Sequence, residues 1–200
     1  MNLPNKLTVS RFVLTAFFLV ALFWPTPIPF RNTIALFLFG FASFTDFLDG
    51  KIARARGLIT NFGILMDPLA DKILTCSAFI AFVESSALHP NAPVRVAAWM
   101  VVIIVARELA ITGLRLLAAS KNVVLAAERY GKHKTISQIV AILALLLANA
   151  SGEWNPPLQK IFADWLPVFA KIALWVTVVL TASSGLLYLW RNRALYLNDL

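Results

Sequence analysis

The sequence predicts an all-α integral membrane protein with six transmembrane helices and both termini on the cytoplasmic side. Hydrophobic residues make up 60% of the 200 residues and charged residues only 14%, a balance that ordinary soluble domains do not have. The net charge of +8 would suit a nucleic-acid-binding protein, but the hydropathy excludes that class. We therefore expect the positive charge to face the lipid bilayer or phosphorylated ligands, with no nucleic acid as partner.

Six apolar segments define the expected helices. They cover residues 8–24, 33–54, 64–84, 94–118, 135–150 and 167–190. A membrane-spanning helix needs about 20 predominantly apolar residues, which the second, fourth and sixth segments reach easily and the first and fifth do not. Clusters of turn-forming residues separate the segments, and little chain is left for a soluble part. Residues 1–200 are therefore expected to form a single membrane domain whose first segment is an uncleaved span.

The distribution of basic residues predicts the orientation. Lys and Arg gather beside both termini and near residues 51–56 and 121–134, and such residues concentrate on the cytoplasmic side of membrane proteins. Four tryptophans fall at the predicted outer boundary, as in an interfacial aromatic belt: Trp24, Trp99, Trp154 and Trp165. The expected location is the inner (cytoplasmic) membrane, with multiple passes.

Four carboxylates interrupt the second and third apolar segments: Asp46, Asp49, Asp67 and Asp71. An ionisable group at membrane depth costs roughly 2.5–3.5 kcal/mol, so a compensating cation is expected. The first two acids are three residues apart and the last two are four apart, which places each pair on one helix face. The short turn between the segments predicts antiparallel neighbours whose acidic faces converge at the cytoplasmic end. A donor set of oxygens alone suits Mg²⁺ or Mn²⁺.

Simpler structural roles would also explain parts of this pattern. Asp67 and Pro68 match a helix N-cap followed by proline at the first helical position. Asp46 and Asp49 would suit a solvated helix end paired with the basic residues that follow. Intramembrane acids also mark cation pathways, but these acids gather at one end while the outer halves of the segments are apolar. A divalent-cation transporter is therefore the weaker alternative.

The spacing from Asp46 to Asp71 resembles the signature of the CDP-alcohol phosphotransferase family, Asp-x₂-Asp-Gly-x₂-Ala-Arg-x₈-Gly-x₃-Asp-x₃-Asp, with every fixed position filled. The resemblance implies the family's six-helix fold, a homodimer and two divalent metal ions, Mg²⁺ or Mn²⁺. It implies that Asp46, Asp49 and Asp67 bind both metals and that Asp71 binds one and serves as the general base. The implied CDP site consists of Asp46, Asp49, Gly50, Ala53, Arg54 and Gly63.

A second group of charged residues points to the acceptor. Arg107 lies inside the fourth segment, and Arg115 follows two turns later on roughly the same face. With Lys132 and Lys134 they are expected to form a cationic pocket for a phosphorylated alcohol. For the two lysines, membrane-flanking charge is an equal alternative. Glu108 is adjacent to Arg107, so its partner is expected on another helix.

The N-terminal residues Asn5, Thr8 and Arg11 drift along one side of the first helix and are possible substrate contacts, although capping and interfacial anchoring would also explain them. Together with the signature and the cationic pattern, they resemble bacterial members of the family. Those members transfer the phosphatidyl group from CDP-diacylglycerol to sn-glycerol 3-phosphate, with the active site facing the cytoplasm. Serine, inositol phosphate and phosphatidylglycerol remain alternative acceptors.

Overall fold

The computed structural model describes residues 3–24, 28–56, 61–89, 91–121, 123, 125 and 129–197, and the side chains of these residues except 3–4, 47–56, 61–62, 64–65 and 129–132. All regular structure in this part of the chain is helical. The long helices are α1 (Leu3–Phe23), α2 (Arg31–Arg56), α3 (Asn61–Leu88), α4 (Ala98–Ser120), α5 (Arg129–Ser151) and α7 (Leu166–Arg191). Two short helices accompany them, α6 (Pro156–Ala163) and α8 (Ala194–Leu197).

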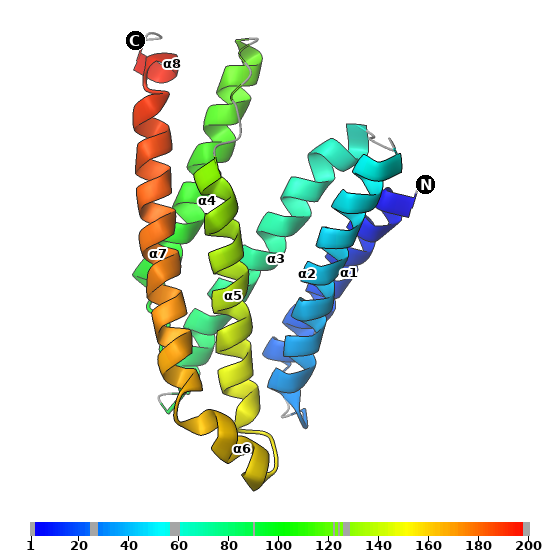
Figure 1. Ribbon diagram of the computed structural model, residues 1–200, viewed down its shortest axis with the longest axis vertical. Helices are drawn as coiled ribbons and strands as arrows, with labels where there is room; N and C mark the ends of the chain where they lie inside the picture. The colour runs from blue at the N-terminus through cyan, green and yellow to red at the C-terminus, as the bar shows by residue number, and fades with distance from the viewer. Residues whose placement is uncertain are drawn as a thin grey trace.

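The long helices run up and down between two ends of the molecule. Figure 1 shows both termini at one end and α6 at the other. Helix α1 packs against α2 and α3, and it contacts each of them more extensively than they contact each other. Helix α2 also packs on α5, α5 on α7, and α7 on α4. The expected pairing of α2 with α3 is therefore mediated largely by α1.

Each predicted segment corresponds to one long helix, with differences at the boundaries. Helices α1 and α5 begin several residues before the apolar segments, because interfacial polar residues continue a helix without raising its hydropathy. Helix α3 begins at Asn61, so Pro68 lies inside it. The interpretation of Asp67 as an N-cap is therefore wrong.

Three helices in the described part of the chain are long and apolar enough to cross a membrane. The qualifying stretches are Asn5–Phe23, His133–Ser151 and Leu166–Arg191. The first, fifth and sixth segments therefore meet this criterion, although the first and fifth were expected to be short. Helix α4 has 23 residues and does not meet it, because Arg107, Glu108 and Arg115 interrupt its apolar sequence. The side chains of α2 are described only for residues 31–46, so its role as a span stays a prediction. Large apolar side chains such as Phe37 (72% exposed) cover the outside, which suits contact with lipid.

Small and aromatic residues fill the interior between the helices. Alanines that are completely buried allow the helix backbones to approach closely: Ala35, Ala42, Ala78, Ala141 and Ala170. The rings of Phe18 on α1 and Phe39 on α2 lie 5.8 Å apart between centroids. This contact holds α1 and α2 together two turns from the ion pair that Arg11 forms with Asp46.

At the end away from the termini, Glu153 joins the α5–α6 connection to the start of α2. Its Oε1 accepts hydrogen bonds from the backbone N–H and the side-chain amide of Asn32, each at 2.8 Å. Its Oε2 accepts from the backbone N–H and the hydroxyl of Thr33, at 3.0 and 2.8 Å. A carboxylate that binds the first N–H groups of a helix satisfies donors that have no partner within the helix. Glu153 is thus an N-cap supplied by a distant segment.

We expect Glu153→Ala to destabilise the fold by about 2 kcal/mol, the upper end of the range for loss of an N-cap. The melting temperature of the detergent-purified protein measures this effect. Glu84→Ala is the matched control, since Glu84 is an exposed carboxylate on the last turns of α3 at the same end. Equal melting temperatures for the two variants would show that the cap contributes nothing.

Candidate functional site

The first part of the site lies where α1 meets the two acid-bearing helices. Arg11 of α1 is completely buried, and its NH1 lies 2.6 Å from Oδ1 of Asp46 on α2. Thr8, one turn earlier, donates its hydroxyl hydrogen to Oδ1 of Asp67 on α3. Residues three apart share a helix face, so one face of α1 holds both acids.

These contacts decide between the alternatives for the N-terminal residues. An interfacial anchor would direct Arg11 toward water and headgroups, whereas its side chain is buried against a carboxylate. Thr8 is also buried, at 1% exposed. Asn5 lies one turn before Thr8 on the same helix. Thr8 and Arg11 therefore contact the acidic residues directly, and a role for Asn5 stays a prediction.

Part of the predicted signature lies outside the residues whose side chains are described, namely Asp49, Gly50, Ala53 and Arg54. Helix α2 is continuous to Arg56, so its backbone keeps Asp46, Asp49, Gly50 and Ala53 on one face, as expected. The early start of α3 likewise places Gly63 on the face of Asp67, four residues before it.

The residues fit a divalent cation by donor type. Asp46 remains 40% exposed at its side chain despite the ion pair with Arg11, and Asp67 lies close enough for the two negative charges to repel. Among the residues described, no three His, Cys, Asp or Glu side chains gather at metal-binding distance, and Asp49 falls outside that set. Carboxylate oxygens are the ligands that Mg²⁺ and Mn²⁺ prefer.

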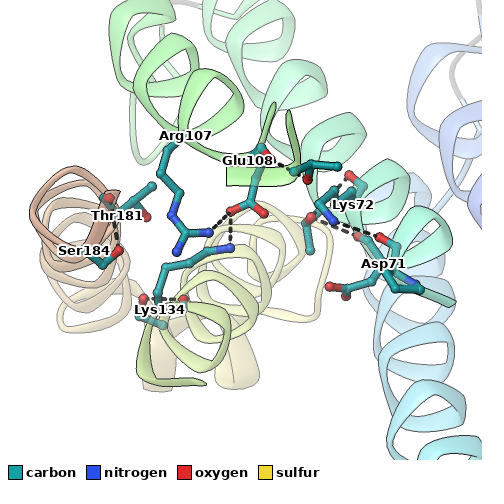
Figure 2. Close-up of polar contacts among 11 residues, drawn as sticks. Asp71, Lys72, Arg107, Glu108, Lys134, Thr181 and Ser184 are labelled. Atoms are coloured by element: carbon teal, nitrogen blue, oxygen red, sulfur yellow. Dashed lines mark hydrogen bonds and ion pairs between the residues drawn. The ribbon is translucent and has the colours of Figure 1, made fainter. Parts of the chain in front are cut away.

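Asp71 lies between this acidic cluster and a second cluster of charges. It is near enough to interact electrostatically with Asp46 and Arg11 on one side, and with Lys134 and Glu108 on the other. Figure 2 shows it on α3 with Lys72, across from the second cluster. Asp71 therefore interacts with charged groups of both clusters, as judged among the residues whose side chains are described.

The second cluster joins α4 to α5. Lys134 of α5 donates to Oε1 of Glu108 on α4, and NH1 of Arg107 donates to the same oxygen at 3.2 Å (Figure 2). The exposed fractions of the three side chains are 5%, 8% and 13%. The expectation that Glu108 has a partner on another helix is confirmed. The expectation that adjacency keeps it from Arg107 is wrong, because the long arginine side chain bends back to the carboxylate.

The remaining predicted acceptor residues are placed differently. Arg115 is exposed, and its guanidinium carbon lies 5.9 Å from the ring centroid of Tyr188 on α7, a cation–π contact. Both arginines of α4 thus lie against α7, but only Arg107 joins the ion-pair cluster. The side chain of Lys132 is outside the described set, and His133 is exposed.

Sequence reasoning missed the polar residues that α5 and α7 add around Arg107. Within the described structure, four buried polar atoms near the α4–α5–α7 contacts have no hydrogen-bond partner: Arg107 Nε, Gln138 Nε2, Thr181 Oγ1 and Tyr188 OH. A signal was available, since Thr177, Thr181 and Gly185 recur every four residues along an otherwise apolar helix.

The arrangement provides two ligand environments beside one carboxylate. The acidic cluster suits cations that bind a diphosphate, and the Arg107–Lys134 cluster suits an anion such as a phosphate. With Asp71 between them, a group bound on one side can react with a group bound on the other. This geometry is compatible with a transferase for phosphorylated compounds.

Comparison with known proteins agrees with this geometry. The model of the family described as CDP-alcohol phosphatidyltransferase matches residues 1–183. The CDP-diacylglycerol–glycerol-3-phosphate 3-phosphatidyltransferase of Bacillus subtilis is 40% identical over 96% of this chain and 95% of its own length. The protein of the same name from Rickettsia bellii is 30% identical, with 94% and 93% covered. A probable phosphatidylglycerophosphate synthase of Mycobacterium tuberculosis is 35% identical, with 95% and 81% covered. The chain therefore belongs to the CDP-alcohol phosphatidyltransferase family.

Proposed function

We propose that this protein transfers the phosphatidyl group from CDP-diacylglycerol to sn-glycerol 3-phosphate, releasing CMP and forming phosphatidylglycerophosphate. The curated relatives described above carry the names of enzymes for this reaction. The observation that carries the choice of acceptor is the buried pair of cations, Arg107 and Lys134, beside Asp71. An uncharged acceptor such as glycerol would leave this pair without a ligand, whereas a phosphate would bind both.

The acidic cluster would hold the nucleotide end of the donor. Members of the family generally use divalent metal ions, and we assign two, Mg²⁺ or Mn²⁺, to Asp46, Asp49, Asp67 and Asp71. When bound, the metals neutralise the diphosphate and so favour departure of CMP. Gly50, Ala53, Arg54 and Gly63 would line the CDP site. Arg11 and Thr8 orient Asp46 and Asp67 from the side of α1.

Asp71 is positioned to act as the general base. A hydroxyl of the acceptor gives up its proton to the Asp71 carboxylate while its oxygen attacks the phosphorus that carries the diacylglycerol. The bond from that phosphorus to the CMP oxygen breaks, and CMP leaves. Arg107 and Lys134 bind the acceptor's own phosphate, which takes no part in the reaction and orients the hydroxyl toward the donor.

The membrane arrangement completes the proposal. Six spans with both termini in the cytoplasm would place both charge clusters in the cytoplasmic half, where CMP and the soluble acceptor are available. The lipid tails of the donor would remain in the bilayer. We assign the protein to the inner membrane as a homodimer.

The direct test incubates the purified protein with CDP-diacylglycerol, Mg²⁺ and one alcohol at a time, and follows CMP release. We expect rapid release with glycerol 3-phosphate and slow release with glycerol, serine, phosphatidylglycerol or inositol phosphate. Glycerol is the matched control because it lacks only the phosphate. Preferential use of serine or glycerol would contradict the assignment of the acceptor, and absence of CMP release with every alcohol would contradict the transferase itself.

Asp46→Asn should lower the transfer rate on the order of a hundredfold or more, because the amide loses the negative charge needed at the diphosphate. Asparagine keeps the size of the side chain and an oxygen for Arg11, so the fold should persist. Additional Mg²⁺ should not restore activity. Asp164→Asn, an exposed acid at the other end of the bundle, is the control and should leave the rate unchanged. Wild-type turnover in Asp46→Asn would remove the metal assignment.

The orientation can be tested with cysteines at two exposed positions. Asn91 lies at the end of the bundle where α6 is found, and Ser120 lies at the end where both termini are found. In a variant whose single Cys76 is replaced by alanine, a membrane-impermeant thiol reagent should label Asn91→Cys in intact cells. Ser120→Cys should react only after the membrane is opened. The opposite labelling pattern would place the charge clusters on the outer side.

A further inference from the structure

Three helices converge on the Arg107–Glu108–Lys134 cluster with hydrogen-bond donors that lack acceptors. They are Nε of Arg107 on α4, Nε2 of Gln138 on α5 and the hydroxyl of Thr181 on α7, none of which has a partner among the described residues. Gln138 is 2% exposed and Thr181 is fully buried. Buried polar groups are almost always hydrogen-bonded, so three such donors in one region require an explanation.

The packing of α7 on α5 places Thr181 beside Lys134. The hydroxyl of Thr177 donates to the backbone carbonyl of Ser137 at 2.8 Å, which sets the register of the two helices. They run in opposite directions in Figure 1. Thr181 is one turn after Thr177 on α7, and His133 is one turn before Ser137 on α5. Because the two helices are antiparallel, Thr181 lies opposite His133, the neighbour of Lys134 in the sequence.

The contact of α7 with α4 places Thr181 beside Arg107 as well. A Cβ atom added to Gly185, one turn after Thr181, would lie 2.6 Å from Cγ of Arg107, so the arginine stem passes where Gly185 has no side chain. Helices α4 and α7 run in the same direction in Figure 1, and side chains tilt toward the N-terminus of their helix. The stem of Arg107 therefore runs from Gly185 in the direction of Thr181, and its guanidinium donates to Glu108 (Figure 2).

Thr181 differs from other hydroxyl residues in the helices of this protein. The hydroxyls of Thr15, Thr75 and Thr112 each donate to the carbonyl four residues earlier, the usual arrangement for a buried helical threonine. Thr177 donates to α5 instead. Thr181 has neither kind of partner among the described residues, although it is completely buried.

The chemistry of the cluster identifies the missing partner. Two cations share a single carboxylate, Glu108, so the cluster carries a net positive charge. Of the three atoms without partners, Arg107 Nε and Gln138 Nε2 only donate hydrogen bonds, and the Thr181 hydroxyl can donate as well. An anion with several acceptor oxygens, such as a phosphate group, would accept from these donors and balance the net positive charge.

We propose that Thr181 is a direct ligand of the acceptor's phosphate, donating its hydroxyl hydrogen to a phosphate oxygen beside Arg107 and Lys134. This inference rests on the proposed function and adds α7 to the acceptor site. Gly185 supports the same site by leaving room for the stem of Arg107, and Gln138 lies one turn beyond Lys134 on the same face of α5.

The test compares Thr181→Val with the wild type, because valine keeps the shape of threonine and removes only the hydroxyl. The apparent KM for glycerol 3-phosphate should rise about tenfold, as expected for loss of one hydrogen bond to a charged group. The apparent KM for CDP-diacylglycerol should not change. Thr181→Ser, which keeps the hydroxyl, should retain a KM close to that of the wild type. Without substrate, Thr181→Val should melt no lower than the wild type, since no internal bond is lost.

Thr177→Val is the matched control, one turn away on the same helix and equally buried. It removes the bond to the Ser137 carbonyl, so its melting temperature should fall while its KM for glycerol 3-phosphate stays unchanged. Thr181→Val should therefore change the KM for glycerol 3-phosphate and not the melting temperature, and Thr177→Val should change the melting temperature and not that KM.

Several outcomes would overturn the inference while leaving the proposed function intact. They are an unchanged KM for glycerol 3-phosphate in Thr181→Val, an equal rise of both KM values, or a fall in melting temperature like that of Thr177→Val. Failure of the proposed function would appear instead in the wild type and in Thr177→Val, as absence of transfer to glycerol 3-phosphate. If the wild type used another phosphorylated alcohol, the same comparison with that alcohol would decide the role of Thr181. Use of unphosphorylated acceptors alone would overturn both.

Discussion

The pairing of buried cations with carboxylates on neighbouring helices is the constraint on which the rest of this structure depends. A single charge in an apolar helix bundle is costly, and a partner from another helix offsets that cost only when the two helices are held at a fixed distance and rotation. Arg11 with Asp46 fixes α1 against α2, and Lys134 with Glu108 fixes α5 against α4. The hydrogen bond from Thr8 to Asp67 adds α3 to the first pair. The positions of the long helices and of the site therefore follow from the same contacts.

The two ends of the bundle are stabilised by different means. At the end away from the termini, Glu153 caps α2, and Trp154, Phe162 and Trp165 pack ring against ring with centroids 5.5 and 6.0 Å apart. These contacts satisfy backbone groups and bury apolar surface. Nearer the termini, the charged groups satisfy one another only in part, because several donors around Arg107 have no partner among the described residues. The polar groups around Glu153 are therefore satisfied within the protein, whereas several donors around Arg107 are left for the proposed ligand.

Much of this could be predicted from the sequence. Hydropathy located the helical segments, and the spacing of Asp67 and Asp71 predicted a shared face. The sequence also predicted that Glu108 has a partner on another helix, which Lys134 provides. Periodicity states which residues share a face, but it does not state which helix that face meets. The contacts of Thr8 and Arg11 with the acids could not be predicted for this reason, and neither could the position of Thr181.

Two predictions from the sequence failed because local sequence signals do not include contacts with other helices. Pro68 normally signals a helix start, yet packing of α3 against α1 keeps the helix continuous through it. The apolar stretch of α4 looked sufficient as a span, although Arg107, Glu108 and Arg115 interrupt it. In both cases a residue breaks a local rule, and contacts with other helices compensate for it.

In the proposed acceptor site, the sharing of one carboxylate by two cations would combine stability of the empty site with selectivity for an anion. Two carboxylates would neutralise Arg107 and Lys134 and leave little attraction for an anion. No carboxylate would leave two like charges buried together, which the bundle could not tolerate. Glu108 is the carboxylate that both cations contact, and Asp71 adds a second negative charge that interacts with Lys134. In the proposed site, the three-residue cluster keeps a net positive charge that a phosphate would balance and a neutral alcohol would not, so discrimination between acceptors would follow from this charge balance.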